Sequence, residues 1–351
     1  MKLTYFQGRP PNFGDELNAS MWNHLLPQNF FDEDPSTLFI GIGSVIQNNY
    51  PKSARKLVVG SGYGGYTRLP DISDGTWDFR FVRGPRTASA LGLDPRLAIT
   101  DAAVLLRATP LPPPAKAIGT AFIPHYESIE RGDWRAACDL AGIHFIDPTD
   151  STDRVVAQLR GANLVIAEAM HGAIVADAVR TPWIGVKTMH HVHRFKWYDW
   201  TDSLAIPYRP QLLFPSNGRE AWAVATGRSG SGPGARAFFG CPAGHPINWT
   251  CRHLAARSLQ RLCHTDPHLS ADSEIERATD RALKSVELMV REYGGGYGRR
   301  VFRSRSAPRL MQSLHGKGKG ADDQHRAQAE LEKDRHLDKA DHDHDHHHHE
   351  Q

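Results

Sequence analysis

The fold of this chain is indicated by the stretch Asn163-Leu164-Val165-Ile166-Ala167-Glu168-Ala169-Met170-His171-Gly172-Ala173-Ile174-Val175-Ala176-Asp177-Ala178. Its first five residues form a short, largely apolar run of the kind that becomes a buried strand. The run that begins at His171 and continues to residue 180 has the length and composition of a helix. A strand that leads directly into a helix is the repeating unit of a parallel α/β sheet.

The same alternation extends along the chain in both directions from this stretch. The expected strands are residues 38–43, 56–62, 78–83, 117–124, 143–146, 163–167 and 183–186, and the expected helices are residues 86–92, 134–141, 152–160, 171–180 and 273–291. A proline-rich run at 109–114 has the extended, stiff character of a domain linker. The sequence therefore predicts two doubly wound α/β domains, residues 1–110 and 111–298, with a loop or insertion at 216–252. A ligand cleft is expected between the domains.

Residues 299–351 differ from the rest of the chain in composition. They hold few apolar residues, and nine of the 20 histidines lie between His315 and His349. A segment with so little apolar surface cannot offset its chain entropy by burial, so we expect a disordered tail. The His/Asp run at 341–349 is either a solvated tail without a specific ligand or a weak site for zinc, nickel or copper.

The overall composition excludes several classes of protein. The chain has 351 residues and a formal net charge of +3, which does not indicate a nucleic-acid partner. No run of 18 apolar residues is present, so we expect no transmembrane helix, and residues 1–10 lack the apolar stretch of a secretory signal. The four cysteines have no metal-like spacing and fit reduced thiols in a cytoplasmic protein.

Several turns at strand ends or helix starts carry candidate ligand-binding residues. In residues 12–18 a glycine and acids open an apolar helix, whose free backbone N–H groups could meet an anion. Asp15 in this segment is either the helix cap or a substrate ligand. Residues 41–44 form a glycine turn after a strand, which by itself indicates only a steric requirement.

Two further turns carry charged candidates. Arg83 and Arg86 flank a Gly-Pro turn at a strand end, and their guanidinium groups could bind a carboxylate or phosphate or could form structural salt bridges. Asp101 opens an apolar run and is either a helix cap or a site residue.

The sharpest catalytic candidate is His171, which we expect at a strand tip and at a helix N-terminus. An imidazole there can accept or donate a proton near neutral pH. Glu168 lies close enough in sequence to orient or acidify it, and His125 follows another strand toward the same cleft. Three histidines, His190, His191 and His193, lack the partner glutamate of a zinc site. Their basic surroundings, which include Lys187, Arg194 and Lys196, favour a loop that meets phosphate.

Five segments occur in the same order as in polysaccharide pyruvyl transferases. They are Asn12-Phe13-Gly14-Asp15-Glu16-Leu17-Asn18, Gly41-Ile42-Gly43-Ser44, Val82-Arg83-Gly84-Pro85-Arg86-Thr87, Ile123-Pro124-His125-Tyr126 and Ala169-Met170-His171-Gly172-Ala173. Over residues 1–210 the chain resembles the succinoglycan-type branch, the exopolysaccharide ketal pyruvate transferases. The order of five segments is more specific than any one of them.

The resemblance implies two Rossmann-like domains of the glycosyltransferase B type. It also implies phosphoenolpyruvate as donor and a sugar of a lipid-linked or polymeric glycan as acceptor, so that the chain would meet the inner face of the membrane peripherally. The product would be a pyruvate ketal, and the reaction needs neither a metal nor a redox cofactor. Together the turns and the resemblance suggest as substrate-binding residues Asn12, Gly14, Asp15, Asn18, Gly43, Ser44, Arg83, Arg86, Asp101, Met170, Gly172, Lys187 and Arg194.

One position departs from the family pattern. Many relatives have Arg-Leu-His-Gly in the fifth segment, with the arginine at the donor, whereas this chain has Ala169-Met170-His171-Gly172. Another cation must then contact the donor, and the candidates are Arg83, Arg86, Lys187 and Arg194. The alternatives are a sugar-nucleotide-dependent glycosyltransferase and a non-catalytic glycan-binding protein of the same fold, because fold alone does not decide function.

Overall fold

The computed structural model describes residues 1–187, 194–227 and 232–294. Met1–Arg305 form one compact unit and Ser306–Gln351 a second, and every described element belongs to the first unit. The expected tail at 299–351 lies outside the described residues. The same holds for His190, His191 and His193.

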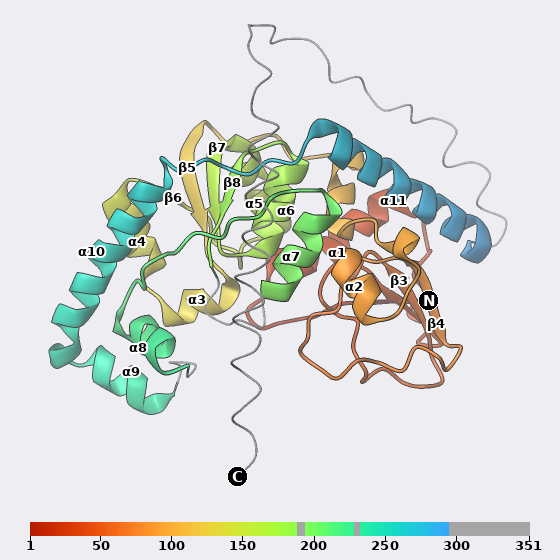
Figure 1. Ribbon diagram of the computed structural model, residues 1–351, viewed down its shortest axis with the longest axis horizontal. Helices are drawn as coiled ribbons and strands as arrows, with labels where there is room; N and C mark the ends of the chain where they lie inside the picture. Colours follow the sequence, from red (N-terminus) through yellow and green to blue (C-terminus); the bar gives the residue numbers. More distant parts are fainter. Residues whose placement is uncertain (188–193, 228–231, 295–351) are drawn as a thin grey trace, which may run out of the picture. The chain divides into compact units, whose positions relative to one another are not determined.

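The first sheet contains four parallel strands in the simple order β1-β2-β3-β4 (Figure 1). The strands are β1 (Lys2–Thr4), β2 (Thr37–Ile40), β3 (Arg55–Val59) and β4 (Trp77–Phe81). Helix α1 (Phe13–Leu25) connects β1 to β2, but the two later connections contain no helix. The prediction of a doubly wound first domain is therefore wrong, because strand order never reverses in this sheet. Residues from the helix-free loops, among them Val45 and Ile46, cover one of its faces.

The second sheet is also parallel, but its order is β6-β5-β7-β8. Its strands are β5 (Ile118–Ile123), β6 (His144–Phe145), β7 (Ala162–Ala167) and β8 (Trp183–Gly185), and the helices between them are α3 (Tyr126–Arg131), α4 (Trp134–Ala141), α5 (Thr152–Gly161) and α6 (Met170–Ala178). The chain turns from one side of β5 to the other between β6 and β7, which confirms the doubly wound prediction for this half. The crevice at such a reversal lies outside the carboxyl ends of β5 and β7, the strands that lead to His125 and Glu168.

The remaining helices follow or connect these sheets. They are α2 (Pro85–Ala90), η1 (Pro95–Leu97), η2 (Ala102–Ala108), α7 (Arg194–Ser203), α8 (Gly218–Thr226), α9 (Pro233–Gly240), η4 (Pro242–Gly244), α10 (His245–Leu262) and α11 (Asp272–Tyr293). Residues 216–252, expected as a loop or insertion, contain α8, α9 and the first part of α10, so the segment is not a loop. Helix α10 lies along α4 and buries small side chains, including Ala255, in the core that also contains Cys138.

The two sheets share one hydrophobic core. Phe13 and Leu17 of α1, Leu105 of η2 and Ala173 of α6 belong to a single buried cluster. Helix α11 also belongs to it and lies beside β4 and η2 (Figure 1). The Ser285 hydroxyl on α11 donates to the Arg80 carbonyl at 3.1 Å. Helix α11 therefore packs against the first sheet, while the predicted boundary at residue 110 stays a prediction.

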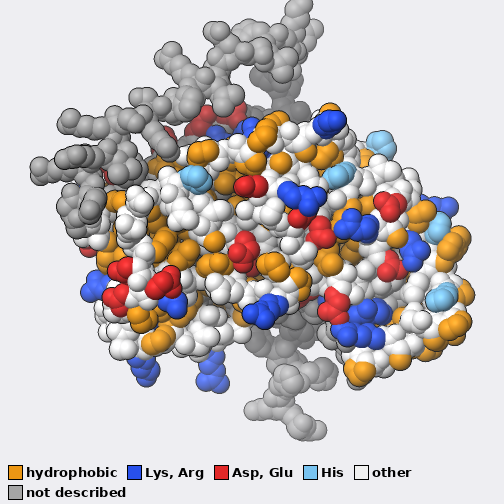
Figure 2. Space-filling model, turned by 180° about the vertical axis from the view of Figure 1, so that it is seen from behind, with side chains coloured by type: hydrophobic (Ala, Val, Ile, Leu, Met, Phe, Trp, Pro, Cys, Tyr) orange, Lys and Arg blue, Asp and Glu red, His pale blue; other side chains and the backbone are white. Residues whose placement is uncertain are grey.

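The surface carries both signs of charge. On the face shown in Figure 2, Asp and Glu side chains are interspersed with Lys and Arg. Among residues 1–187, 194–227 and 232–294, no helix combines the length and the apolar character needed to cross a bilayer. All four cysteines are free thiols.

Candidate active site

The N-terminus of α1 is capped by Asn12 and not by Asp15. The Asn12 amide oxygen accepts the Gly14 backbone N–H at 3.4 Å, and its amide nitrogen donates to an Asp15 carboxylate oxygen at 2.8 Å. Asp15 is 9% exposed. Burial raises the pKa of its carboxyl to about 6, against the opposing effects of the Asn12 hydrogen bond and the Lys196 charge. Since Asn12 does the capping, Asp15 is left as a candidate ligand or proton carrier.

Gly14 allows His171 to lie against the first turn of α1. A Cβ atom at Gly14 would be 2.3 Å from His171 Nδ1, which no real contact tolerates, so only glycine fits here. Gly43 lies close to the same turn with φ +124°, a conformation that favours glycine, and the position of its missing Cβ is 3.5 Å from an Asp15 carboxylate oxygen. At Gly14 and Gly43, two of the predicted positions, glycine is therefore favoured by the close approach of the chain to His171 and by the backbone conformation beside Asp15.

His171 faces Asp101 across the junction of the two sheets. Its Nε2 is 3.9 Å from Asp101 Oδ2, and the His171 side chain is 11% exposed while that of Asp101 is fully buried. Within the described part of the chain, neither of these two buried atoms has a hydrogen-bond partner. The other oxygen of Asp101 accepts the Ala103 N–H at 2.9 Å and caps η2. One oxygen of Asp101 therefore caps η2 while the other faces His171, so the cap and the candidate site role do not exclude each other.

The protonation states of this pair follow from burial. Desolvation lowers the pKa of the His171 imidazole to about 3, and the positive charges of Lys196 and Arg83 act in the same direction. Desolvation raises the pKa of the Asp101 carboxyl to about 6, opposed chiefly by the Arg83 charge. At neutral pH the imidazole is therefore uncharged and keeps a free lone pair on one ring nitrogen, although its low pKa makes it a weaker base than a solvated histidine.

Lys196 of α7 is a further candidate, which the sequence indicated only as part of the basic surroundings of the three histidines. Burial lowers the pKa of its ammonium group to about 8, and the Arg83 charge acts the same way, while Asp15, Glu127 and Asp101 raise it. The sequence next to Lys196 could have indicated that this part of the chain is buried. Trp197, Asp199 and Trp200 follow Lys196 directly, and α7 buries all three.

Arg83 forms structural contacts, which is one of the two alternatives that the sequence left open. Its side chain is fully buried, and its Nε donates to Asp199 at 3.0 Å. Its two terminal nitrogens donate to the Ser44 hydroxyl at 2.6 Å and to the Tyr63 carbonyl at 2.9 Å. Asp199 also accepts the Thr87 N–H at 2.8 Å, so α7 is fastened to the start of α2. Arg83 and Ser44 therefore belong to a buried hydrogen-bond network that holds α7, the helix that carries Lys196, in place.

Replacing Arg83 with Ala is expected to lower the free energy of unfolding by about 3–5 kcal/mol, because Asp199 is left as a buried charge without its cation. Urea denaturation followed by circular dichroism measures this change. Arg86→Ala is the matched control, since the Arg86 side chain is 45% exposed where it pairs with Asp202, and it should cost no more than about 1 kcal/mol. An Arg83→Ala chain of unchanged stability that no longer binds phosphoenolpyruvate would restore Arg83 as a ligand.

The sequence suggested that Glu168 could orient His171, but in the structure its carboxylate binds other partners. One of its carboxylate oxygens accepts the His125 N–H at 2.8 Å, and the other accepts the Ser128 hydroxyl at 3.1 Å. Burial raises the pKa of this carboxyl to about 7, and the Glu220 charge raises it further. His125 caps α3, and its Nδ1 accepts the Glu127 N–H at 3.4 Å. Glu168 and His125 therefore lie together at the start of α3.

Three other predicted ligand residues have packing roles. The Asn18 amide group donates to the Asp15 and Ile42 carbonyls and accepts from the Ile42 N–H and the Trp22 indole, so its hydrogen bonds are used. Met170 is 3% exposed in the shared core. A Cβ atom at Gly172 would be 2.7 Å from Ile123, so this glycine lets α6 approach β5.

A comparison with known proteins identifies the family of this chain. The family model of the polysaccharide pyruvyl transferases matches residues 12–190, which include Asp15, Asp101 and His171. The chain belongs to the polysaccharide pyruvyl transferase family. It is 43% identical over 224 residues to the succinoglycan biosynthesis protein ExoV of Rhizobium meliloti (strain 1021), which covers 63% of this chain and 70% of that protein. No solved structure matches the chain.

The cations of this pyruvyl transferase can now be compared as donor ligands. Arg83 is enclosed, and Arg86 pairs with Asp202 at 2.8 Å while lying over the Tyr198 ring. Lys187 lines a small cavity of about 30 Å³ with Glu168, and Arg194 is exposed at the start of α7. Ala169, where many relatives have arginine, is 6% exposed in the core. The Lys196 charge lowers the pKa values of both Asp15 and His171, and the charges of Asp15, Glu127 and Asp101 raise the pKa of Lys196 itself.

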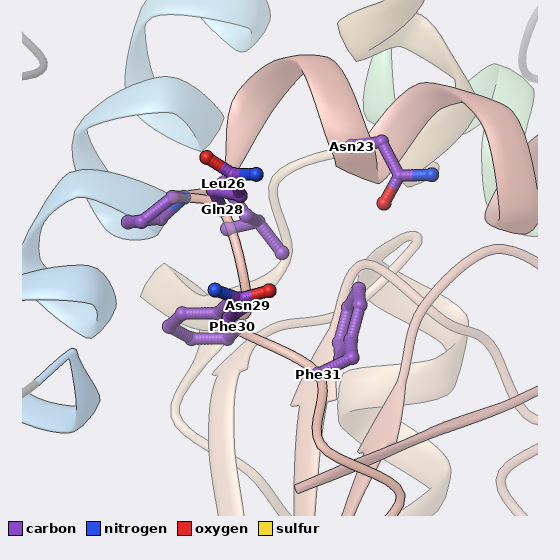
Figure 3. A pocket seen from close by; sticks show the side chains of 7 residues that line it. Asn23, Leu26, Gln28, Asn29, Phe30 and Phe31 are labelled. Atoms are coloured by element: carbon purple, nitrogen blue, oxygen red, sulfur yellow. The ribbon is translucent and has the colours of Figure 1, made fainter.

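A separate hollow of about 540 Å³ lies at the opposite end of α1 in this pyruvyl transferase (Figure 3). Asn23 of α1 and Phe30 and Phe31 from the following segment line it. A helix of 13 residues is about 20 Å long, so this hollow is remote from Gly14 and His171. Among the described residues, no group of three or more His, Cys, Asp and Glu is placed to hold a metal ion.

Proposed function

We propose that this pyruvyl transferase transfers the three-carbon pyruvate unit of phosphoenolpyruvate to two hydroxyls of one sugar in an exopolysaccharide repeat unit, releases phosphate, and so forms a pyruvate ketal. The observation that carries the proposal is the uncharged His171 ring at the start of α6, which lies against Gly14 and faces Asp101. Membership in the family supports the class of reaction. The similarity to a protein of succinoglycan biosynthesis supports an exopolysaccharide acceptor.

The chemistry requires two proton movements and one leaving group. Protonation of the methylene carbon of the donor gives an oxocarbenium-like centre, and a sugar hydroxyl attacks that centre. Phosphate then leaves, and a second hydroxyl of the same sugar closes the ketal ring. The two sugar hydroxyls together lose two protons. One of these replaces the proton that was added to the methylene carbon, and the other is carried away by the released phosphate. A group that can accept and return a proton suits both steps.

Each described residue has a distinct role in this proposal. His171 exchanges the proton with the attacking hydroxyl. Asp101 is a positioning residue: its carboxylate faces Nε2, so it favours the tautomer that carries the proton on Nε2 and leaves the Nδ1 lone pair beside Gly14 as the base. The Lys196 ammonium group supplies the positive charge for the carboxylate or phosphate of the donor. Asp15, whose carboxyl pKa burial raises to about 6, lies in the first turn of α1, against which His171 lies.

Replacing Lys196 with Ala is expected to weaken phosphoenolpyruvate binding by about tenfold to a hundredfold, because a hydrogen bond to a charged group contributes about 1.5–3 kcal/mol. Lys196→Arg should retain part of the affinity, since it keeps the charge. Titration calorimetry measures the effect. The matched control is Arg194→Ala, which removes an exposed cation from the first turn of the same helix. Equal affinities for Lys196→Ala and wild type would move the donor site elsewhere.

A donor panel tests the whole assignment. With acceptor glycan present, phosphate should be released from phosphoenolpyruvate, and no nucleotide should be released from sugar nucleotides. Nucleotide release would instead support the glycosyltransferase alternative. Phosphoenolpyruvate should also raise the melting temperature of the wild-type chain, because a ligand that binds only the native state stabilises it by mass action.

A further inference from the structure

The surface formed by α8, α9 and α10 has an unusual composition. Residues 212–262 contain six arginines and a single acid, Glu220. Glu220 is 1% exposed, and its carboxylate accepts hydrogen bonds from the Ser216 hydroxyl and the Trp134 indole, so it offers no charge to solvent. The accessible charge of this segment is therefore positive.

The same segment concentrates exposed apolar side chains. Eight of the fourteen large hydrophobic residues that are exposed in the described part of the chain lie between Leu212 and Leu254. Those on the three helices are Trp222, Val224, Phe238, Ile247, Trp249 and Leu254, and Trp249 is 59% exposed. Helices α8, α9 and α10 contact one another, so these side chains lie in one region of the surface, and exposed apolar regions of this kind can mark interaction sites.

Helix α9 is held in place although it buries no residue of its own. The ring of Phe239 lies against Gly218, where a Cβ atom would be 2.4 Å from it, and Asn248 of α10 donates to the Phe239 carbonyl at 2.8 Å. Asn248 also accepts the Gly218 N–H at 2.9 Å. With Phe239 as its anchor, the helix presents Phe238, 54% exposed, to solvent.

Neighbouring elements neutralise only part of the positive charge. Arg236 pairs with Glu130 of α3, and Arg252 pairs with Asp133 at 2.8 Å. Arg257 is exposed on α10, and Glu130 and Asp133 pair with other arginines. Figure 2 shows Lys or Arg side chains beside hydrophobic ones at its lower right, the part of the molecule that holds α8 to α10.

We propose that the α8–α10 surface docks on an anionic membrane. Tryptophan and phenylalanine suit the boundary between headgroups and acyl chains, and arginines are drawn to the negative surface potential of acidic lipids. The almost complete lack of acids favours a lipid surface over a protein partner, whose complementary site would ordinarily use both signs of charge. Docking would place the enzyme where lipid-linked glycans are found, but the proposal holds whatever donor the active site uses.

Sedimentation of the full chain with vesicles tests the proposal. The wild-type chain should sediment with phosphatidylglycerol-rich vesicles and much less with pure phosphatidylcholine vesicles. Raising the salt from about 0.1 M to about 1 M should weaken binding, because the screening length falls from about 10 Å to about 3 Å. Phe238→Ser combined with Trp249→Ser should weaken binding by about tenfold or more, since membrane affinity scales with buried apolar area.

Matched controls separate this surface from the rest of the chain. Leu69→Ser combined with Leu288→Ser changes two residues of similar exposure, 49% and 51%, outside the segment, and should leave binding unchanged. Arg257→Glu should weaken binding more than Arg154→Glu, which changes an exposed arginine of α5. A wild-type chain that stays in the supernatant overturns the proposal. Vesicle binding that survives the Phe238/Trp249 double substitution overturns it too, because another part of the chain would then be responsible. So does a dimer that the same substitutions dissociate, because a second copy would then cover this surface.

Discussion

A His171→Gln chain is expected to lose pyruvyl transfer by about 100- to 10,000-fold while binding phosphoenolpyruvate nearly as well as wild type. The reason is that glutamine can hydrogen-bond but cannot titrate, and a positioned acid or base typically contributes this factor to the rate. Glutamine also nearly fills the space of the ring beside Gly14, so the substitution leaves little cavity. Phosphate release in the presence of acceptor glycan measures the rate, and calorimetry measures donor affinity.

His125→Gln is the matched control for His171. The His125 ring is occupied at the start of α3, where its Nδ1 accepts the Glu127 N–H, so we expect only a small loss of rate. The thermal unfolding of both variants should stay cooperative. If His171→Gln keeps more than about a tenth of the wild-type rate while His125→Gln does not, the proton-transfer role belongs to His125.

An Asp101→Asn chain is expected to lose up to about 10,000-fold in rate with little change in stability or donor affinity. Asparagine caps helices about as well as aspartate, so the hydrogen bond from Ala103 should survive. An asparagine amide can however donate to Nε2, which would move the ring proton to Nδ1 and block the base. Loss of about this size follows when an Asp-to-Asn change in another histidine-carboxylate pair imposes the wrong tautomer.

The control for this change is Asp94→Asn. Asp94 caps η1 just as Asp101 caps η2, with its side chain accepting the Arg96 N–H at 2.9 Å, but it is remote from any histidine contact that the structure records. Nitrogen-15 spectra of the full chain report the tautomer, and the difference from a His171→Gln spectrum assigns the signals of His171. An unchanged tautomer and an unchanged rate in Asp101→Asn would reduce Asp101 to a helix cap. A changed tautomer would stand even if phosphoenolpyruvate proved not to be the donor.

Much of the second half of the fold could be predicted from the sequence, because each apolar run there is bounded by glycine, proline or polar residues. Strands β5 and β7 and helices α4 to α6 lie where the pattern places them. The strand order of the first sheet could not be predicted. The segments between β2, β3 and β4 form no helices, so they do not follow the strand–helix–strand pattern on which the prediction relied. The helices at 216–252 were missed because glycine, serine and arginine dominate there, and the buried side of α10 relies on small residues such as Ala255.

The candidate site shows the same division between local and distant information. His171, Asp101 and Asp15 could be found because each begins a helix after a strand or turn, and the structure brings them together. The sequence could not decide between the two roles of Arg83, because its partner Asp199 lies 116 residues further along the chain. Lys196 was passed over because it lies beyond the family segments, inside a helix whose aromatic residues suggest only packing.

Helix α11 has a consequence for how the protein is made. The hydrogen bond from Ser285 to Arg80 joins residues 205 positions apart, and Val286 and Met289 are buried in the same core as Phe81. A ribosome therefore releases β1 to β4 long before the helix that covers them emerges. Until then the apolar surface that α11 will cover is exposed to solvent or bound by a chaperone. The first half of the chain cannot complete its folding ahead of the second, and translation that stops before residue 272 would yield an aggregation-prone fragment rather than a smaller folded protein.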